Sequence, residues 1–212
     1  MNKIDDAFTF YSHHINDKEK LRLLNEYHLP VVGSVASVMW ELFAAILTGR
    51  SGNGATGLDL DGWEVKSSKD QCAFEYQYHR NTGLEKMMGE YTANHLFISY
   101  SETYDDVSVR VIDGRVLAKK FFKCWKPEYM ENYRLEESSS GRQRFRKSIP
   151  YKYVNITGTP ILEITNGVIT SRSDNWYNSV METINKRQRA EHYALFIASQ
   201  QKSSIDKQLT TV

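Results

Sequence analysis

The residues most able to do chemistry lie in one short stretch, residues 57–68. Its sequence, GLDLDGWEVKSS, sets three acids and a lysine among leucine, tryptophan and valine. Asp61-Gly62 stands between two runs of alternating apolar residues, which is the strongest short signal for a β-hairpin. A two-residue type I′ turn needs positive φ at both positions, and Asp-Gly tolerates this. The stretch therefore predicts a tight hairpin.

The predicted hairpin sorts these side chains onto two faces. Asp59 stands opposite Glu64, and Lys66 shares the face of Glu64 because side chains alternate along a strand. The other face carries four residues suited to burial: Leu58, Leu60, Trp63 and Val65.

The two facing carboxylates repel each other. Opposite β-carbons lie ~5 Å apart, and two carboxylates ~4 Å apart at an effective dielectric of about 20 repel by roughly 4 kcal/mol. A hard divalent cation offsets this repulsion and leaves positions for water and phosphate, while Lys66 can hold or deprotonate an attacking water. The alternative is a solvent-exposed hairpin in which Lys66 neutralises one acid.

Asp59 followed by Glu64-Val65-Lys66 resembles the active-site signature of the PD-(D/E)XK nuclease superfamily, an acid ending one strand and then Glu-x-Lys on the next. The sequence departs from this pattern in two ways. Leu58 stands where many members have Pro, and the acid is close to the Glu-x-Lys, which leaves both Asp59 and Asp61 open as the first acid. The hairpin geometry favours Asp59, because turn chemistry alone explains Asp61.

This resemblance implies a fold and a reaction. The fold is α/β (α+β), a mixed central β-sheet flanked by helices with a restriction-endonuclease-like core; pattern alone gives only α/β or α+β. The function is a metal-dependent DNA endonuclease, sequence-specific on double strands as a type II restriction enzyme, in which Asp59 and Glu64 hold Mg²⁺ and Lys66 orients the attacking water. A mismatch-repair-type nickase or a junction resolvase is an alternative within the class. A non-catalytic nucleic-acid-binding protein is the alternative outside it.

Another acid, Glu41, lies in a predicted helix over residues 35–48, with Ser34 as a candidate cap. The helix is apolar nearly all round, so it is expected to be buried. Over residues 33–68, the order of helix with Glu, Gly/Ser-rich loop, acid and Glu-x-Lys resembles the nicking endonuclease of methyl-directed mismatch repair. This resemblance implies that Glu41 is a further catalytic and metal-binding residue. The alternative is an ordinary, partly exposed helix acid.

The rest of the chain predicts alternating helices and strands. The strand at 72–79 is expected to extend the hairpin's sheet, with its polar face beside the charged face. In the following helix, Leu84, Met87 and Met88 have core spacing. Asn166-Gly167 predicts another tight turn. The patterns predict helices over 16–29, 81–91 and 174–199, and strands over 72–79, 95–100, 107–112, 152–156 and 160–165.

Residues 110–152 are distinctly basic. They hold 12 Lys or Arg against 5 acids, a net of +7 in a chain whose net charge is only +1. Aromatic residues are interleaved with these charges. The pattern fits an electrostatic footprint for a polyanion, and the resemblance implies that this polyanion is double-stranded DNA. The alternative is a set of charge-rich surface loops and helix faces.

Within this segment, Arg142-Gln143-Arg144-Phe145-Arg146-Lys147 follows a Ser/Gly-rich lead-in that predicts a mobile loop. If the loop extends on binding, the alternation places Arg142, Arg144 and Arg146 on one side. Arg reads guanine bidentately, so Arg142, Arg144 and Arg146 are predicted DNA-binding residues, at least one of them a base contact, and Lys147 a phosphate contact. The alternative is a loop that acts only as an electrostatic clamp.

Length and composition bound the remaining possibilities. With 212 residues, 41% of them hydrophobic, the chain fits a single nuclease domain over 1–212 with 110–152 as a basic, DNA-contacting subregion. Two cysteines, Cys72 and Cys124, predict neither a disulfide framework nor a zinc site, which favours a reducing, cytoplasmic location. No signal peptide or membrane span is predicted. Symmetric cleavage would favour a homodimer, and nicking a monomer.

Overall fold

The computed structural model describes residues 3–52, 54, 57–134, 144–183 and 186 of the chain. The chain divides into two compact units, Met1–Asp174 and Asn175–Val212. In the second unit, residues 176–183 are helical, and Trp176 and Val180 are buried. The rest of the long helix predicted over 174–199 lies largely outside the described residues. All the strands described below belong to the first unit.

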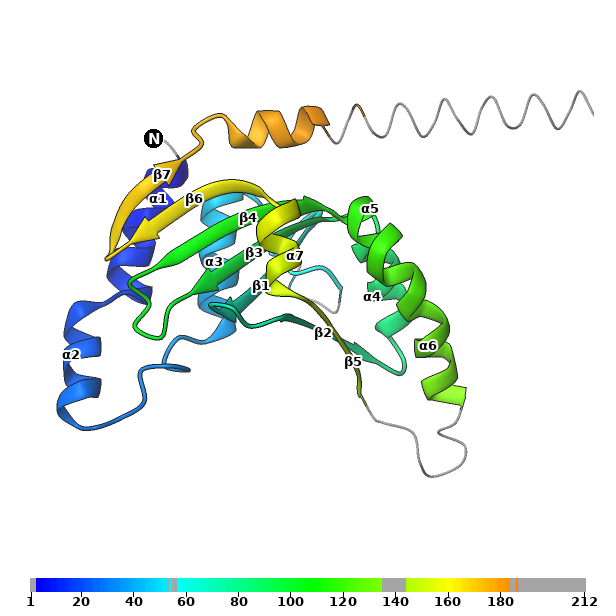
Figure 1. The fold of residues 1–212 in the computed structure, drawn as a ribbon, viewed down its shortest axis with the longest axis horizontal. Helices are drawn as coiled ribbons and strands as arrows, with labels where there is room; N and C mark the ends of the chain where they lie inside the picture. The colour runs from blue at the N-terminus through cyan, green and yellow to red at the C-terminus, as the bar shows by residue number, and fades with distance from the viewer. Residues whose placement is uncertain (1–2, 53, 55–56, 135–143, 184–185, 187–212) are drawn as a thin grey trace, which may run out of the picture. The chain divides into compact units, whose positions relative to one another are not determined.

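A five-stranded mixed sheet, in the order β1-β3-β4-β6-β7, forms the centre of the first unit (Figure 1). Strand β1 runs parallel to β3, and the other neighbours are antiparallel. The predicted class, α/β (α+β) with a mixed central sheet flanked by helices, is confirmed. The strands are β1 (Trp63–Lys69), β3 (Asn94–Tyr100), β4 (Val107–Asp113), β6 (Thr159–Thr165) and β7 (Val168–Arg172).

Helices flank this sheet, and their ends follow from local chemistry. Asp17 caps α2 by accepting the backbone N–H groups of Glu19 and Lys20. Helix α3 begins after Ala36, which makes no side-chain cap, so the expected Ser34 cap is wrong; it ends at Gly49, whose φ is +68°. The helices are α1 (Lys3–Phe10), the π-helix η1 (Tyr11–Ile15), α2 (Lys18–Glu26), α3 (Ser37–Thr48), α4 (Gly83–Glu90), α5 (Gly114–Leu117), the π-helix η2 (Ala118–Phe122), α6 (Lys123–Arg134) and α7 (Tyr151–Thr157).

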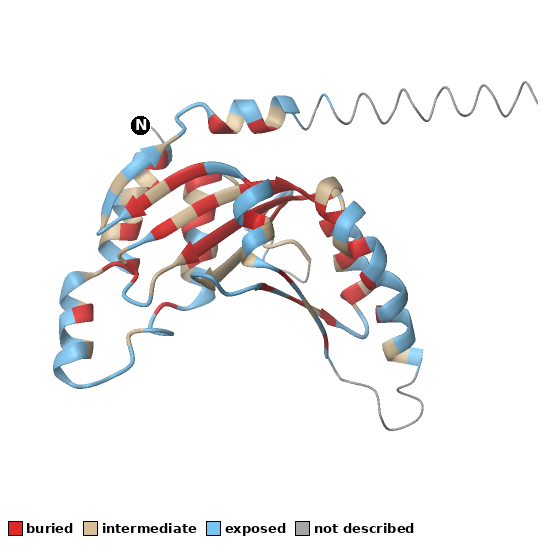
Figure 2. Cartoon of the chain, in the orientation of Figure 1, coloured by how far each residue is buried: buried red, intermediate tan, exposed pale blue. Residues whose placement is uncertain are grey.

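Strand β2 (Phe74–His79) leaves the central sheet and pairs with β5 (Arg144–Ile149) in an antiparallel two-stranded sheet. The expectation that residues 72–79 extend the hairpin's sheet is therefore wrong. The cause is packing: the aromatic residues of β2 are buried in a cluster with η2 and α6, and they alternate with more exposed polar residues. Figure 2 shows buried and exposed residues on this strand. Aromatic burial thus decides where this strand lies.

Of three further expectations, two differ in detail from the structure and one is confirmed. Residues 152–156 are not a strand but lie in α7, which Pro150 precedes with a φ already fixed near the helical value. Asn166-Gly167 forms the predicted turn, with φ of +53° and +75°. In Asp61-Gly62 only the glycine has positive φ, +75°, so the turn resembles type II and not type I′.

The predicted core spacing in α4 holds only in part. Met87 is buried, whereas Met88 is 43% exposed. No helix in the described part of the chain is long and apolar enough to cross a membrane.

Candidate active site

The candidate site is built around Glu64 on β1, whose side chain is 0% exposed. Among the described strands β1 pairs only with β3, so its other edge is open to side chains. The Val65 N–H donates to Oδ2 of Asp59 at 2.9 Å. The predicted hairpin is closed by the Leu60–Trp63 bridge, and this backbone bond holds Asp59 beside β1. Asp59 and Glu64 therefore lie close together at the same edge of β1.

Two ammonium groups meet at one oxygen of Glu64. Lys66 Nζ lies 2.5 Å from Oε1 of Glu64, and Lys86 Nζ, from α4, lies 3.0 Å from the same atom. Burial alone would raise the pKa of Glu64, but the charges of Lys66 and Lys86 outweigh it and hold the pKa below its usual range. Glu64 is therefore a buried carboxylate that stays ionised.

The surroundings of Asp59 disfavour its ionised form. Burial raises its pKa to about 6, and the charge of Glu64 acts in the same direction. The repulsion expected from the sequence thus operates in the folded protein. Asp61, two residues away, is exposed and pairs with Arg50 at 3.2 Å, as a turn residue would.

A second buried acid, Glu90, comes from the last turn of α4. Tyr78 donates its hydroxyl to Oε2 of Glu90 at 2.5 Å, and Lys86 Nζ lies 3.9 Å from Oε1. Burial, and then the charge of Glu64, raise the pKa of Glu90 above its usual range. Lys86 therefore lies between two buried carboxylates, close to Glu64 and farther from Glu90.

His95 on β3 forms hydrogen bonds with two groups beside this cluster. Its Nε2 lies 2.8 Å from the Glu90 carbonyl oxygen, and its Nδ1 lies 2.8 Å from the Tyr76 hydroxyl. A carbonyl oxygen only accepts, so Nε2 carries the hydrogen and Nδ1 accepts from Tyr76. Burial lowers the pKa of His95 to about 4, which keeps the ring neutral at ordinary pH. The ring joins the end of α4 to β2.

The donors fit a hard cation that needs few protein ligands. Oε2 of Glu64 is buried without a hydrogen-bond partner among the described residues. No group of three or more His, Cys, Asp or Glu in the described ranges could hold a metal ion. Mg²⁺ usually keeps several waters and takes only one or two carboxylates plus substrate phosphate. Asp59 and Glu64 match that requirement.

The structure does not join Glu41 to this cluster. Glu41 is half-buried on α3 and makes no hydrogen bond or ion pair with any residue in the described part of the chain. Its charge is not among those that shift the pKa of Asp59 or Glu64. A metal-binding role for Glu41 stays a prediction.

Sequence reasoning missed Lys86 and Glu90, which α4 brings to Glu64. A signal was present: Gly83, Met87 and Glu90 follow one another at helical spacing and are the buried residues of α4. An acid within such a buried stripe needs a partner, by the same argument that drew attention to Glu41.

The predicted DNA-contacting residues divide between described and undescribed parts of the chain. Arg142 lies outside the described residues. Arg144 and Arg146 are exposed on β5, and Lys147 pairs with Glu128 of α6. From residue 144 onward the expected loop is thus a strand.

No protein-family model matches the chain, and a search of curated proteins finds no match either. What the chain does is therefore inferred from its own residues.

Proposed function

We propose that the chain is a metal-dependent DNA endonuclease that hydrolyses phosphodiester bonds, cutting double-stranded DNA at specific sequences as type II restriction enzymes do. One observation carries the proposal. Glu64 is fully buried, contacts both Lys66 and Lys86, and keeps one oxygen without a hydrogen-bond partner among the described residues. A cytoplasmic location and, if both strands are cut, a homodimer belong to the same proposal.

The energetic cost of this cluster supports a functional role. Burying ion pairs is often no better for stability than packing apolar residues of similar volume, because desolvation offsets the attraction. Asp59 adds to that cost, because its burial and then the charge of Glu64 raise its pKa to about 6. Perturbed carboxyl groups gathered beside lysines are typical of catalytic sites.

Each residue of the cluster has a role in this proposal. Asp59 and Glu64 would hold Mg²⁺, which when bound supplies Lewis acidity to the phosphate and lowers the pKa of a bound water. Burial alone would lower the pKa of Lys66, but Glu64 and Asp59 outweigh it and raise the pKa. Lys66 therefore stays protonated and orients the attacking water as a hydrogen-bond donor. Lys86 adds a second positive charge at the same carboxylate.

The decisive experiment compares Asp59→Asn with Asp61→Asn in cleavage of supercoiled plasmid with Mg²⁺. Asn at position 59 can still accept the Val65 N–H, so a loss of cleavage would not come from unfolding. We expect Asp59→Asn to lower the cleavage rate about 100-fold or more, because an electrostatic contribution to the transition state is removed. Asp61→Asn should cleave normally, since Asn-Gly makes similar turns.

A second pair of variants on β1 strengthens this experiment. Lys66→Ala should abolish cleavage, whereas Lys69→Ala should not, because Lys69 is exposed and pairs with Glu102 at 2.8 Å. Undiminished cleavage by Asp59→Asn, or full cleavage in excess EDTA, would contradict the proposal.

The second candidate is a nucleic-acid-binding protein whose acids never take metal. One observation favours it: Lys66 and Lys86 already neutralise Glu64 in the structure. Binding of DNA without cleavage under Mg²⁺ or Mn²⁺ would select this candidate.

A further inference from the structure

The two-stranded sheet of β2 and β5 has one buried face and one open face. Phe74, Tyr76 and Tyr78 of β2 lie on the buried face, together with two residues of β5. On the open face, Gln77 stands opposite Arg146 and His79 opposite Arg144. Arg144, Arg146 and His79 are exposed, and Gln77 is half-buried. This open face carries two arginines and other long polar side chains.

The dimensions of this ribbon suit the major groove of DNA. Each strand has six residues, which span about 20 Å at ~3.3 Å per residue, and paired strands lie ~4.8 Å apart. The major groove of B-DNA is about 12 Å wide and admits a two-stranded β-ribbon. Burial of the inner face on the hydrophobic core leaves the outer side chains to contact a partner.

The side chains on the open face are those that read bases. Arg donates two hydrogen bonds to O6 and N7 of guanine, and Gln pairs with N6 and N7 of adenine. Glu75, also on this face, accepts from Gln77 Nε2 and lies 3.7 Å from Arg146 Nη1. Such exposed contacts are weak and readily exchanged for contacts with bases. Glu75 therefore does not block Gln77 and Arg146 from contacting bases.

The same strand also touches the candidate active site. The ring of Tyr76, between Glu75 and Gln77, lies 4.8 Å from Lys66 Nζ, and its hydroxyl bonds to His95. Strand β2 thus carries polar side chains on one face and contacts the charged cluster with the other. Recognition on the open face and chemistry beside Lys66 would share one rigid strand.

From this arrangement we infer that the β2–β5 ribbon enters the major groove of double-stranded DNA and reads bases through Gln77, Arg144 and Arg146. The choice of DNA as the partner rests on the proposed function. Gln77 of β2 thereby belongs to the same base-contacting surface as Arg144 and Arg146 of β5.

The test uses full-length Asp59→Asn protein with Ca²⁺ and a pool of DNA duplexes with a randomised centre. We expect the pool to yield a preferred sequence. Gln77→Ala, Arg144→Ala and Arg146→Ala should each lose the preference at one position and weaken binding of the preferred duplex about tenfold or more, with little change on a scrambled duplex. Lys119→Ala and Lys120→Ala, at exposed cations of η2, are the matched controls and should keep the preference.

A modified base locates the contact in the major groove. Replacing guanine with 7-deazaguanine removes the N7 acceptor, which should weaken binding by the parent protein but not further by the arginine variant that reads that guanine. Equal weakening on preferred and scrambled duplexes by all three ribbon variants would overturn the inference, because the ribbon would then contact only phosphates. Absence of any preferred sequence would also overturn it.

These outcomes separate the two proposals. If the unaltered protein cleaves plasmid and the ribbon variants keep the sequence preference, the nuclease proposal is supported and the inference that the ribbon reads bases is overturned. A preference that depends on the ribbon, without cleavage under any metal, would do the reverse.

Discussion

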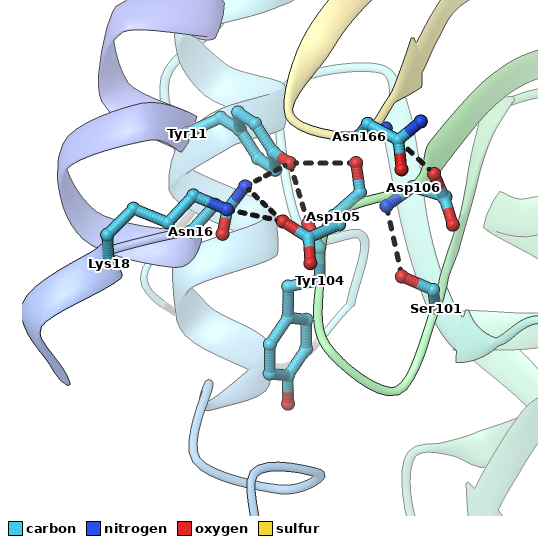
Figure 3. Close-up of polar contacts among 8 residues, drawn as sticks. All are labelled: Tyr11, Asn16, Lys18, Ser101, Tyr104, Asp105, Asp106 and Asn166. Atoms are coloured by element: carbon cyan, nitrogen blue, oxygen red, sulfur yellow. Dashed lines mark hydrogen bonds and ion pairs between the residues drawn. The ribbon is translucent and has the colours of Figure 1, made fainter. Parts of the chain in front are cut away.

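The cluster around Tyr11 and the cluster around Glu64 both bury polar groups between segments far apart in the chain, but they satisfy those groups differently. Tyr11 donates its hydroxyl to the Tyr104 carbonyl at 2.6 Å and accepts from Asn16 Nδ2 at 2.9 Å (Figure 3). Burial raises the pKa of Tyr11 above its usual range, so the hydroxyl stays neutral. The buried centre of this network is uncharged.

The charges of the Tyr11 network lie at its edge and hold loops in place. Lys18 pairs with Asp105, whose carbonyl accepts the Gly167 N–H at 2.8 Å. Asp106 accepts the Asn166 N–H at 3.0 Å, as Figure 3 shows. The network thereby fastens the segment of η1 and α2 to the β3–β4 loop and the β6–β7 turn.

At Glu64 the charges are in the buried centre. Oε2 of Glu64 and Oε1 of Glu90 both lack hydrogen bonds to described residues, whereas the Tyr11 network leaves only the neutral Oδ1 of Asn16 in that state. Unsatisfied buried charge costs more than an unsatisfied neutral amide. The Tyr11 network thus satisfies nearly all of its buried polar groups within the chain, whereas the Glu64 cluster leaves carboxyl oxygens without hydrogen bonds, as the proposed binding of a metal would require.

The largest effect on stability is expected for Glu64→Gln. This change removes the nearest counter-charge of Lys66 and Lys86, and breaking a buried pair costs about 3–5 kcal/mol. The two lysine side chains are 15% and 23% exposed, so partial solvation favours the lower end of that range. Urea unfolding measures the loss. Glu102→Gln, which breaks an exposed pair, should cost less than about 1 kcal/mol; equal stability of the two variants would refute the distinction.

A pH-dependent gain in stability is expected for Asp59→Asn. A carboxyl whose folded pKa is raised stabilises the fold below its unfolded pKa, and this stability is lost as pH rises through the folded pKa of about 6. The shift of about two pKa units corresponds to about 3 kcal/mol. Asp59→Asn should therefore be more stable than the parent by up to that amount at about pH 8, and the two should be equally stable at about pH 4.

Urea unfolding at several pH values checks this expectation. Asp61→Asn is the control, and its stability relative to the parent should not vary with pH. A difference between Asp59→Asn and the parent that is constant with pH would rule out the ionisation of Asp59 as its cause.

The smallest effect is expected for Tyr11→Phe. The change removes the hydrogen bond to the Tyr104 carbonyl and should cost about 1–2 kcal/mol. DNA cleavage should be unchanged, because Tyr11 makes no contact with the Glu64 cluster among the described residues. Tyr27→Phe, at a side chain 68% exposed, should alter neither quantity. A cleavage defect in Tyr11→Phe would break the division between the two networks.

Local patterns predicted the parts of the site that are neighbours in the sequence. Alternation along β1 put Glu64 and Lys66 on one face, and turn chemistry set Asp61 apart from Asp59. The same patterns could not foretell that α4 brings Lys86 and Glu90 to Glu64, since periodicity says which face of a helix is buried but not which strand it meets.

The same difference between local patterns and contacts among distant elements applies to the fold. Strands β3 and β4 and helices α2 and α3 were predicted near their observed positions, because each is an apolar or amphipathic run that local sequence signals mark. The place of β2 was not, because its alternation fits either sheet. Only the aromatic cluster with Trp125 and Phe122 decides that β2 pairs with β5.

The open edge of β1 also bears on self-association. A strand edge with unpaired N–H and C=O groups is a template on which a strand of another molecule can add. The Asp59 carboxylate occupies the Val65 N–H on that edge and sets a charge beside it. The side chain that costs stability at neutral pH thus places a charge where a strand of a second molecule would have to pair.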